Sequence, residues 1–316
     1  MNWEGFPERV HIQEVVTRDG LQIEPRFLPT QEKIALIDAL SLTGVSKIEV
    51  TSFVSPRAVP NLADAREVAG AIKRRPGVTY VALVPNLRGA QEALAANMDE
   101  LNLVMSVSET HNLANMRMTP AQSLEAFRTI VDAARGTPAA LNGSIATAFG
   151  CPFEGIQPED KVLRLAEAYL ALGLDSVTLA DTTGMGNPRQ VASLVGAFRR
   201  RFGSVPLTLH FHNTRGMGLA NVLAALDAGA DRFDASLGGL GGCPFAPGAT
   251  GNISTEDLVH MLDEMGVATG VDLGRLIELA RGLPALLGHD IPGQVAKAGR
   301  SGDLHPAPAD IRLAAK

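Results

Sequence analysis

The chain has 316 residues, of which 46% are hydrophobic and 20% are charged, which allows one large hydrophobic core or two domains at most. The formal net charge is −6 and no basic block occurs, so nucleic acid is excluded as an expected partner, because phosphate-binding surfaces cluster Lys and Arg. No apolar run approaches the roughly 18 residues of a membrane span. The N-terminal segment also lacks the apolar core of a signal peptide, so we expect a cytoplasmic protein that does not enter a membrane.

Eight β-type segments alternate with helical stretches along the chain. They are expected at residues 10–16, 47–51, 79–84, 100–105, 140–146, 176–180, 207–211 and 232–236. This alternation predicts an α/β fold with a parallel sheet, and eight units over about 240 residues fit a (β/α)8 TIM barrel. A doubly wound open sheet is the alternative, but it usually carries G-x-G-x-x-G after its first strand, and here T-R-D-G follows instead.

Helix signals mark several of the stretches between these segments. Thr119 and Gln122, with a proline between them, form the pattern of a capping box. After the eighth segment, two more helices are expected near 255–266 and 273–287. We therefore expect one barrel domain with additional C-terminal helices over residues 1–288, and an irregular tail over residues 289–316.

The two cysteines, Cys151 and Cys243, each lie in a segment rich in glycine and proline. In an intracellular chain this placement favours free thiols over a structural disulfide. Cys243 follows the glycine-rich stretch 238–242, which is explained either as a flexible connection or as a mobile loop beside an active site.

Polar residues at the ends of barrel strands are candidates for one shared site, because this fold keeps its chemistry there. His210 and His212 stand at a strand end, where alternate side chains point to the same face. With Asp19 and Asn252 they make a mixed set of oxygen and nitrogen donors. Such a set suits Mg²⁺ or Mn²⁺, whereas a structural zinc would favour thiolates.

Each candidate has a simpler explanation when it is taken alone. Asp19 precedes a glycine, which is a common turn pair, and Asp181 is also explained as a turn or helix cap. Glu49 lies within an apolar β-type run, where a carboxylate needs a buried partner, and Arg18 is the candidate partner. Glu14 in the first segment raises the same question. The coincidence of these residues at predicted strand ends favours a common site.

Several motifs resemble those of the 3-hydroxy-3-methylglutaryl-CoA lyase family, within a wider group of metal-dependent TIM-barrel lyases and Claisen-condensing enzymes. They are R-D-G-L-Q (18–22), I-E-V-T-S-F-V-S-P (48–56), F-G-C-P-F-E-G (149–155), A-D-T-T-G (180–184), H-F-H (210–212) and G-L-G-G-C-P-F-A (239–246), continued by G-A-T-G-N-I-S-T-E-D (248–257). R-D-G and H-x-H are shared with isopropylmalate synthase-like and aldolase relatives. R-D-G-L-Q and the glycine-rich motif are specific to the lyases.

The resemblance implies a role for each matching polar residue. The implied metal ligands are Asp19, His210, His212 and Asn252. The implied catalytic residues are Arg18, which stabilises a thioester enolate, Cys243, which protonates it from a closing loop, and His210 or Asp181, which acts as general base. The residues implied in support of catalysis or substrate placement are Gln22, Glu49 and Glu256.

The implied reaction is retro-Claisen cleavage of 3-hydroxy-3-methylglutaryl-CoA, or of a related branched 3-hydroxyacyl-CoA, to acetyl-CoA and acetoacetate or the corresponding keto acid. The implied cofactor is Mg²⁺ or Mn²⁺, and the implied assembly is a homodimer. Two alternatives stay open: a metal-dependent hydroxy-oxo-acid aldolase or condensing enzyme of the same barrel group, and a non-catalytic barrel that binds metal or CoA.

The chain departs from the family pattern just after the second histidine. Asn213 and Arg215 stand where these lyases commonly have a carboxylate and an aromatic residue, and Ala180 stands in place of a glycine. We hypothesise that Arg215 recognises an additional or differently placed substrate carboxylate. The alternative is a solvated arginine at a helix start.

Overall fold

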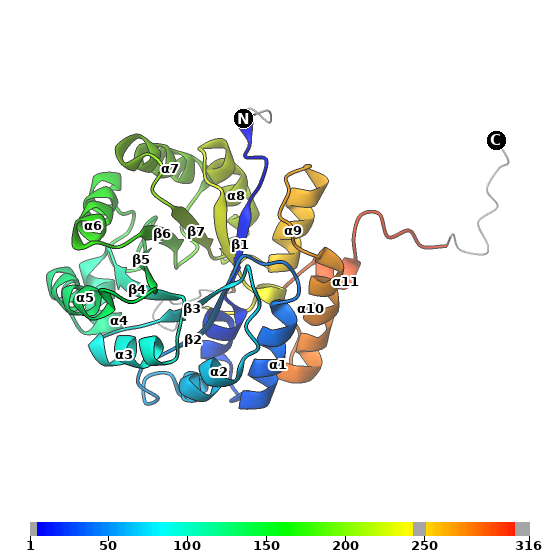
Figure 1. The fold of residues 1–316 in the computed structure, drawn as a ribbon. Coiled ribbons are helices and arrows are strands. Elements are labelled where there is room, and N and C mark those ends of the chain that lie inside the picture. Colours follow the sequence, from blue (N-terminus) through cyan, green and yellow to red (C-terminus); the bar gives the residue numbers. More distant parts are fainter. Residues whose placement is uncertain (1–4, 243–250, 307–316) are drawn as a thin grey trace.

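The computed structural model describes residues 5–242 and 251–306. Within them, eight parallel strands form a closed barrel in chain order, surrounded by helices (Figure 1). The strands are β1 (His11–Glu14), β2 (Lys47–Ser52), β3 (Thr79–Leu83), β4 (Glu100–Ser106), β5 (Ala140–Ala146), β6 (Ser176–Asp181), β7 (Leu207–Phe211) and β8 (Arg232–Ala235). Because β1 pairs with β8, the sheet has no edge. The predicted TIM barrel is confirmed and the open sheet is excluded.

Helices follow the strands and extend beyond the eighth. They are α1 (Thr30–Leu40), α2 (Ala65–Ala71), α3 (Leu87–Ala95), α4 (Glu109–Met116), α5 (Pro120–Ala134), α6 (Glu159–Leu172), α7 (Pro188–Phe202), α8 (Gly218–Asp227), α9 (Thr255–Glu264), α10 (Leu273–Leu287) and α11 (Val295–Ala298). Short helical turns are η2 (Val16–Gly20), η3 (Leu21–Ile23), η4 (Pro60–Leu62) and η5 (Leu237–Gly239). None of the helices in the described residues is long and apolar enough to cross a membrane.

The local signals correspond to observed contacts. The Thr119 side chain accepts a hydrogen bond from the Gln122 backbone N–H, and the Gln122 side chain accepts one from the Thr119 N–H, which completes the capping box of α5. A short helix, α11, lies within the tail for which we expected irregular backbone. It forms because Val295 and Ala296 are buried and the Asp257 carboxylate accepts the Val295 N–H at 2.7 Å.

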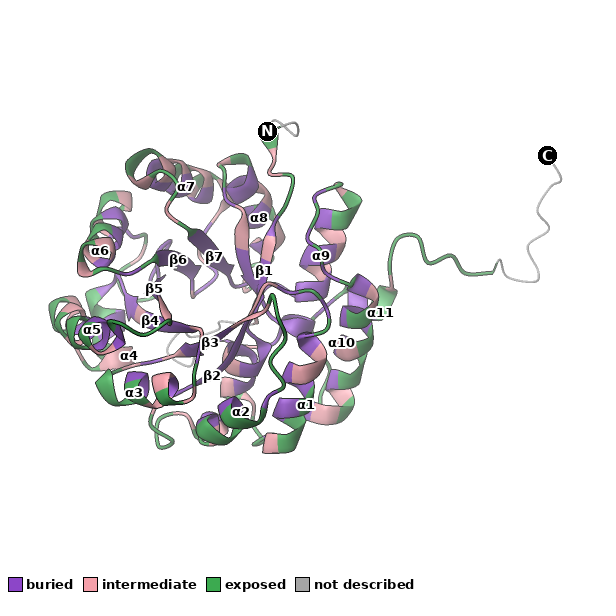
Figure 2. Cartoon of the chain, in the orientation of Figure 1, coloured by how far each residue is buried: buried purple, intermediate pink, exposed green. Residues whose placement is uncertain are grey.

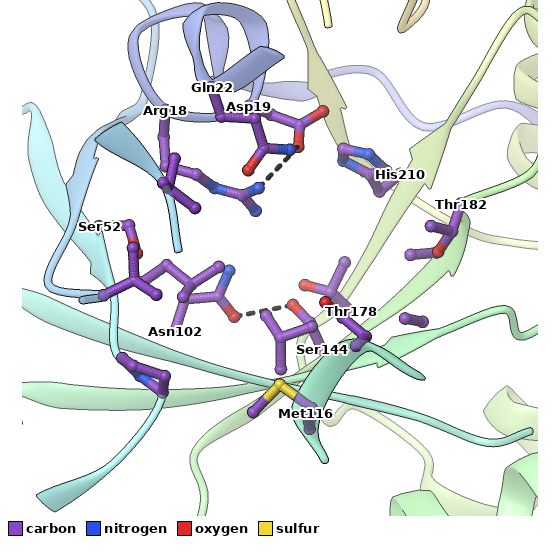
Figure 3. Close-up of a pocket in the computed structure, with 18 of the residues that line it drawn as sticks. Arg18, Asp19, Gln22, Ser52, Asn102, Met116, Ser144, Thr178, Thr182 and His210 are labelled. Atoms are coloured by element: carbon purple, nitrogen blue, oxygen red, sulfur yellow. Dashed lines mark hydrogen bonds and ion pairs between the residues drawn. The ribbon is translucent and has the colours of Figure 1, made fainter. Parts of the chain in front are cut away.

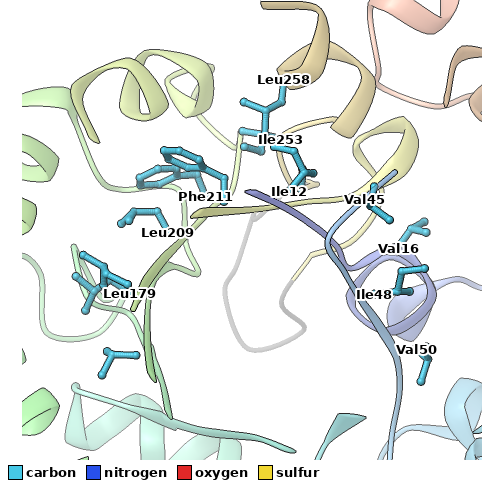
Figure 4. Packing of buried hydrophobic residues seen from close by; sticks show 14 of the residues in the cluster. Ile12, Val16, Val45, Ile48, Val50, Leu179, Leu209, Phe211, Ile253 and Leu258 are labelled. Atoms are coloured by element: carbon cyan, nitrogen blue, oxygen red, sulfur yellow. The ribbon is translucent and has the colours of Figure 1, made fainter. Parts of the chain in front are cut away.

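The core lies between the barrel and its helices, whose inner faces are buried and outer faces exposed (Figure 2). Figure 4 shows part of this layer, in which Phe211 and Leu209 of β7, Leu258 of α9 and Ile12 of β1 belong to one cluster of buried side chains. Burial of such side chains from every strand stabilises the closed barrel and fixes which residues end up at its rim.

The first predicted strand ends earlier than expected. After Glu14 the chain enters the π-helical turn η2, in which the N–H groups of Arg18 and Asp19 both donate to the Val15 carbonyl, at 3.1 and 2.7 Å. This turn places Arg18 and Asp19 at the rim of the barrel. Arg18 and Asp19 therefore reach the barrel mouth from a turn, although the sequence suggested a strand end.

Two buried carboxylates hold the C-terminal segments: Glu14 joins them to β1, and Glu256 joins α9 to η5. Glu14 accepts the N–H groups of Val16 and Leu237 at 2.8 and 3.0 Å and the Thr255 hydroxyl at 2.7 Å. Glu256 accepts the Gly238 N–H at 3.0 Å. Burial raises the pKa of each carboxyl to about 7. Both groups therefore bind protons more tightly in the folded chain than in the unfolded one.

We predict that Gly143→Ala destabilises the barrel. A β-carbon added to Gly143 of β5 would lie 2.7 Å from Leu174 Cδ2 and still closer to the ring of Tyr169, which is fully buried and donates its hydroxyl to the Ser144 carbonyl. Such overpacking costs about 1–3 kcal/mol of unfolding free energy. The measurement is the midpoint of chemical denaturation.

The matched control is Gly282→Ala. Gly282 lies inside α10 with nothing within 4 Å of an added β-carbon. Alanine there should stabilise the chain by about 0.5–1 kcal/mol, because it restricts the unfolded backbone. Equal midpoints for Gly143→Ala and the wild type would contradict the packing argument.

We predict that Glu256→Gln flattens the pH dependence of stability. Between the ordinary glutamate pKa of 4.5 and the folded pKa of about 7, the unfolded chain releases a proton that the folded chain retains. The free energy of unfolding contributed by Glu256 is therefore greatest below pH 4.5, falls as pH rises, and levels off above pH 7. Denaturation across this range measures it. Glu264→Gln, at an exposed position of the same helix, is the control and should keep the wild-type slope.

Candidate active site and metal centre

A cavity of about 450 Å³ opens at the C-terminal ends of the strands. Side chains from around the barrel face one another across it (Figure 3). Its polar lining includes Arg18, Asp19, Gln22, Ser52, Asn102, Ser144, Thr178, Thr182, His210, His212 and Asp234. The prediction that polar residues at several strand ends converge is confirmed by this lining.

Asp19, His210 and His212 form a buried cluster in the cavity wall. One ligand atom from each lies within 4.8 Å of the others, and His210 Nε2 is 3.1 Å from His212 Nε2. Two ligands bound about 2.1 Å from one ion lie about 3–4 Å apart, so this spacing fits a single divalent cation. The residues present therefore fit a metal centre.

Asn252 adjoins the same cluster from the far side of the glycine-rich segment. Its Nδ2 donates to Asp19 Oδ2 at 2.7 Å and to the Leu240 carbonyl at 2.9 Å, and its backbone pairs with that of His212. All four residues that the sequence nominated as ligands are thus neighbours, although they span more than 230 positions of the chain.

Arg18 lies at the centre of a buried group of charges. Its Nε is 2.5 Å from Glu49 Oε2 and its Nη1 is 2.6 Å from Asp19 Oδ1, so the partner expected for Glu49 is present. Glu49 Oε1 also accepts Asn102 Nδ2 at 2.7 Å. Burial acts to raise the pKa of Asp19, but the charge of Arg18, aided by His210, outweighs burial and lowers it. Asp19 is therefore held ionised, as a metal ligand must be.

Gln22 and Asp181 occupy different positions relative to the cavity. Gln22 lines it and donates Nε2 to Asp19 Oδ1 at 2.8 Å. Asp181 is absent from the described lining and accepts the N–H groups of Met185 and Gly186 at 2.9 and 3.0 Å, as the turn explanation required. Burial raises the pKa of Asp181 to about 6. Its Oδ2 has no hydrogen-bond partner among the described residues.

Arg215 does not line the cavity within the described part of the chain. Its Nη1 donates to the carbonyls of Thr183 and Gly184, both at 3.0 Å. The guanidinium therefore braces the turn that follows Asp181. Recognition of a substrate carboxylate by Arg215 stays a hypothesis, and the residue lies at an exposed position.

Of the two remaining candidates, Glu256 and Cys243, the structure describes only Glu256. Glu256 lies beneath η5, where it holds the Gly238 backbone, and it is not among the described cavity-lining residues. Its contribution to substrate placement would act through that segment. Cys243 lies outside the described residues.

Sequence reasoning missed Asp234 of β8. This residue lines the cavity, and its Oδ2 is 3.0 Å from His210 Nδ1. Burial acts to lower the pKa of His210, but the hydrogen bond and charge of Asp234 raise it. The cue was available, because Asp234 sits between Phe233 and Ala235 just as Glu49 sits within its own apolar run.

Comparison with known proteins agrees with this geometry. The HMGL-like family model matches residues 9–282. Hydroxymethylglutaryl-CoA lyase YngG of Bacillus subtilis is 44% identical over 92% of this chain and 97% of its own. The (R)-citramalyl-CoA lyase of Chloroflexus aurantiacus is 43% identical over 92% of this chain and 95% of its own.

The fold of the chain is also similar to that of a solved structure. An HMG-CoA lyase from Acinetobacter baumannii, in complex with coenzyme A and 3-methylmalate, superposes with a TM-score of 0.93 and is 59% identical, covering 95% of this chain and 98% of that one. The family model spans most of the chain, and the relatives match along nearly their whole length. The chain belongs to the HMGL-like family.

Proposed function

We propose that the chain catalyses retro-Claisen cleavage of 3-hydroxy-3-methylglutaryl-CoA, or of a closely related branched 3-hydroxyacyl-CoA, with Mg²⁺ or Mn²⁺. One observation carries the proposal: the buried cluster of Asp19, His210 and His212 adjoins the Arg18 guanidinium in the wall of one cavity. Cation ligands beside a fixed positive charge suit a substrate that develops negative charge as it reacts. Membership of the HMGL-like family supports the same reaction class.

Asp19, His210, His212 and Asn252 would hold the metal ion. Their carboxylate, imidazole and amide donors suit Mg²⁺ or Mn²⁺. When bound, such an ion supplies Lewis-acid polarisation of the substrate hydroxyl and helps to orient it.

Proton removal and bond cleavage then depend on the side chains around the cavity. Asp181, whose Oδ2 has no hydrogen-bond partner among the described residues, is assigned as the base that accepts the hydroxyl proton. His210, the other candidate, has no free lone pair once Nε2 binds the ion and Nδ1–H donates to Asp234. The bond between the carbinol carbon and the thioester α-carbon breaks, and its electron pair moves towards the thioester oxygen. Arg18, held in place by Glu49 and always protonated, stabilises that enolate.

The enolate carbon must finally receive a proton. We assign this step to the Cys243 thiol, which would release acetyl-CoA and leave a thiolate that regains a proton from solvent. Gln22 connects the site to the segment before Cys243, because its Nε2 contacts both Asp19 Oδ1 and, at 3.4 Å, the Gly242 carbonyl. The other product from 3-hydroxy-3-methylglutaryl-CoA is acetoacetate.

Citramalyl-CoA is the second candidate substrate. The Chloroflexus citramalyl-CoA lyase is as similar to this chain as the Bacillus hydroxymethylglutaryl-CoA lyase is, at 43% and 44% identity. The two thioesters differ in whether a methylene separates the carboxylate from the carbinol carbon, and cleavage of citramalyl-CoA gives pyruvate. A single methylene in a pocket is worth only about 1–3 kcal/mol, so overall identity does not select between them.

We further propose a homodimer, from the family resemblance, and a cytoplasmic location, as expected from the sequence. Light scattering coupled to size-exclusion chromatography measures the mass of the assembly, for which twice the chain mass of 33.2 kDa is expected. A monomer under assay conditions would contradict the dimer.

We predict that the reduced, Mn²⁺-loaded protein cleaves a branched 3-hydroxyacyl-CoA. The two thioesters are supplied separately, and mass spectrometry identifies the keto acid. Acetoacetate with acetyl-CoA supports the hydroxymethylglutaryl assignment, and pyruvate with acetyl-CoA supports the citramalyl alternative. Cleavage of neither thioester, nor of other branched 3-hydroxyacyl-CoA esters, would overturn the proposed lyase.

We predict that metal removal abolishes cleavage and that Asp19→Asn weakens metal binding. Loss of an outer partner typically lowers metal affinity 10–100-fold, so loss of a direct ligand should lower Mn²⁺ affinity by more than about 100-fold. Isothermal titration calorimetry measures this affinity. Asp132→Asn, on an exposed turn of α5, is the control and should bind Mn²⁺ like the wild type. Unchanged affinity in Asp19→Asn would exclude Asp19 as a ligand.

A further inference from the structure

Asp234 faces His210 across neighbouring strands. The β7–β8 register pairs the two residues directly, so their side chains project from the same face of the sheet. Asp234 is 5% exposed, and its Oδ2 lies 3.0 Å from His210 Nδ1. On the other side of the ring, His210 Nε2 faces His212 Nε2 and belongs to the cluster with Asp19.

We propose that Asp234 is the positioning residue that makes His210 a metal ligand. This inference rests on the proposed function, because it concerns the same metal centre. A neutral imidazole carries one N–H, and an ionised carboxylate only accepts hydrogen bonds. Asp234 therefore selects the tautomer with the proton on Nδ1. That tautomer presents the lone pair of Nε2 to Asp19 and His212, where a ligand is required.

The contact also fixes the orientation of the ring. Carboxylates that accept the second N–H of a ligating histidine are a common outer partner of metal sites, where they hold the ring and increase its basicity. In this chain Asp234 is the carboxylate that contacts His210. The two residues are register partners in the β7–β8 pair, so no change of backbone is needed to bring them together.

The other carboxylate oxygen argues against a purely structural role. Asp234 Oδ1 is buried and has no hydrogen-bond partner among the described residues. A buried acceptor without a partner costs stability, and an apolar residue of similar size would avoid that cost. The position thus keeps a carboxylate at the expense of stability, as expected where the charge serves the site.

Asp234→Asn tests the proposal with little change in shape. The carboxamide can donate to His210 Nδ1, which favours the tautomer with the proton on Nε2 and removes the ligand lone pair. Mn²⁺ affinity, measured by calorimetry, should fall about 10–100-fold. Long-range ¹H–¹⁵N correlation spectra of the imidazoles should show the His210 proton leaving Nδ1, with the signal assigned by its absence in His210→Gln. The denaturation midpoint controls for folding.

Asp231→Asn is the matched control. Asp231 directly precedes β8 and pairs with Arg199 at 3.5 Å, away from the cavity. This variant should keep wild-type Mn²⁺ affinity and the wild-type His210 signal. If Asp234 acts by positioning, saturating Mn²⁺ should also restore most of the turnover of Asp234→Asn.

Two results overturn the proposal: Mn²⁺ affinity of Asp234→Asn within about twofold of wild type, since outer partners typically matter 10–100-fold, or a His210 proton that stays on Nδ1. Both readouts are independent of substrate. A wild type that binds Mn²⁺ but cleaves no thioester would overturn the proposed function and leave the assignment of Asp234 to be decided by affinity and tautomer.

Discussion

The guanidinium of Arg18 is the charge around which the site is built. Its side chain is 12% exposed, and it pairs with both Asp19 and Glu49. Burial disfavours the ionised form of both carboxylates, and it raises the pKa of Glu49, whereas the charge of Arg18 lowers the pKa of Asp19. The guanidinium keeps Asp19 ionised at the barrel mouth. It also ties the η2 turn to β2, so the electrostatic and geometric requirements of the site are met by one side chain.

Closure of the barrel supplies the second constraint. Side chains of neighbouring parallel strands at the same level share a face, so the register alone brings His210 to Asp234. The proposed ligand set is completed by a turn after β1, which carries Asp19, and a segment after β8, which carries Asn252. The site residues therefore lie where the chain leaves the sheet. The apolar layer between the strands and the helices keeps these strand ends in place.

The sequence predicted the strands and most of the site. Two of the eight expected strands, 140–146 and 207–211, match the observed bounds, because apolar periodicity reports burial directly. Glu49 and Arg18 were paired in advance, since a carboxylate in an apolar run requires a partner. Asp234 obeys the same rule but was not singled out from the sequence, and its partner, His210, lies on the neighbouring strand.

Other features depend on contacts that a linear reading does not contain. Arg215 follows the histidine pair in sequence, yet its guanidinium turns to backbone carbonyls near residue 184. The helix α11 depends on Asp257, almost 40 positions earlier. In both cases one polar side chain forms hydrogen bonds with backbone groups of a distant segment. Local sequence propensities do not predict which distant residue provides such a bond.

The contacts of Glu14 join both ends of the segment after β8 to the first strand. One carboxylate binds the Leu237 N–H and the Thr255 hydroxyl, and the backbones of Ser236 and Ser254 pair beside it. Both ends of the intervening segment are thus anchored to the same point of β1. Loss of that one carboxylate would therefore release Leu237 and Thr255 together, so the two anchors are kept or lost cooperatively.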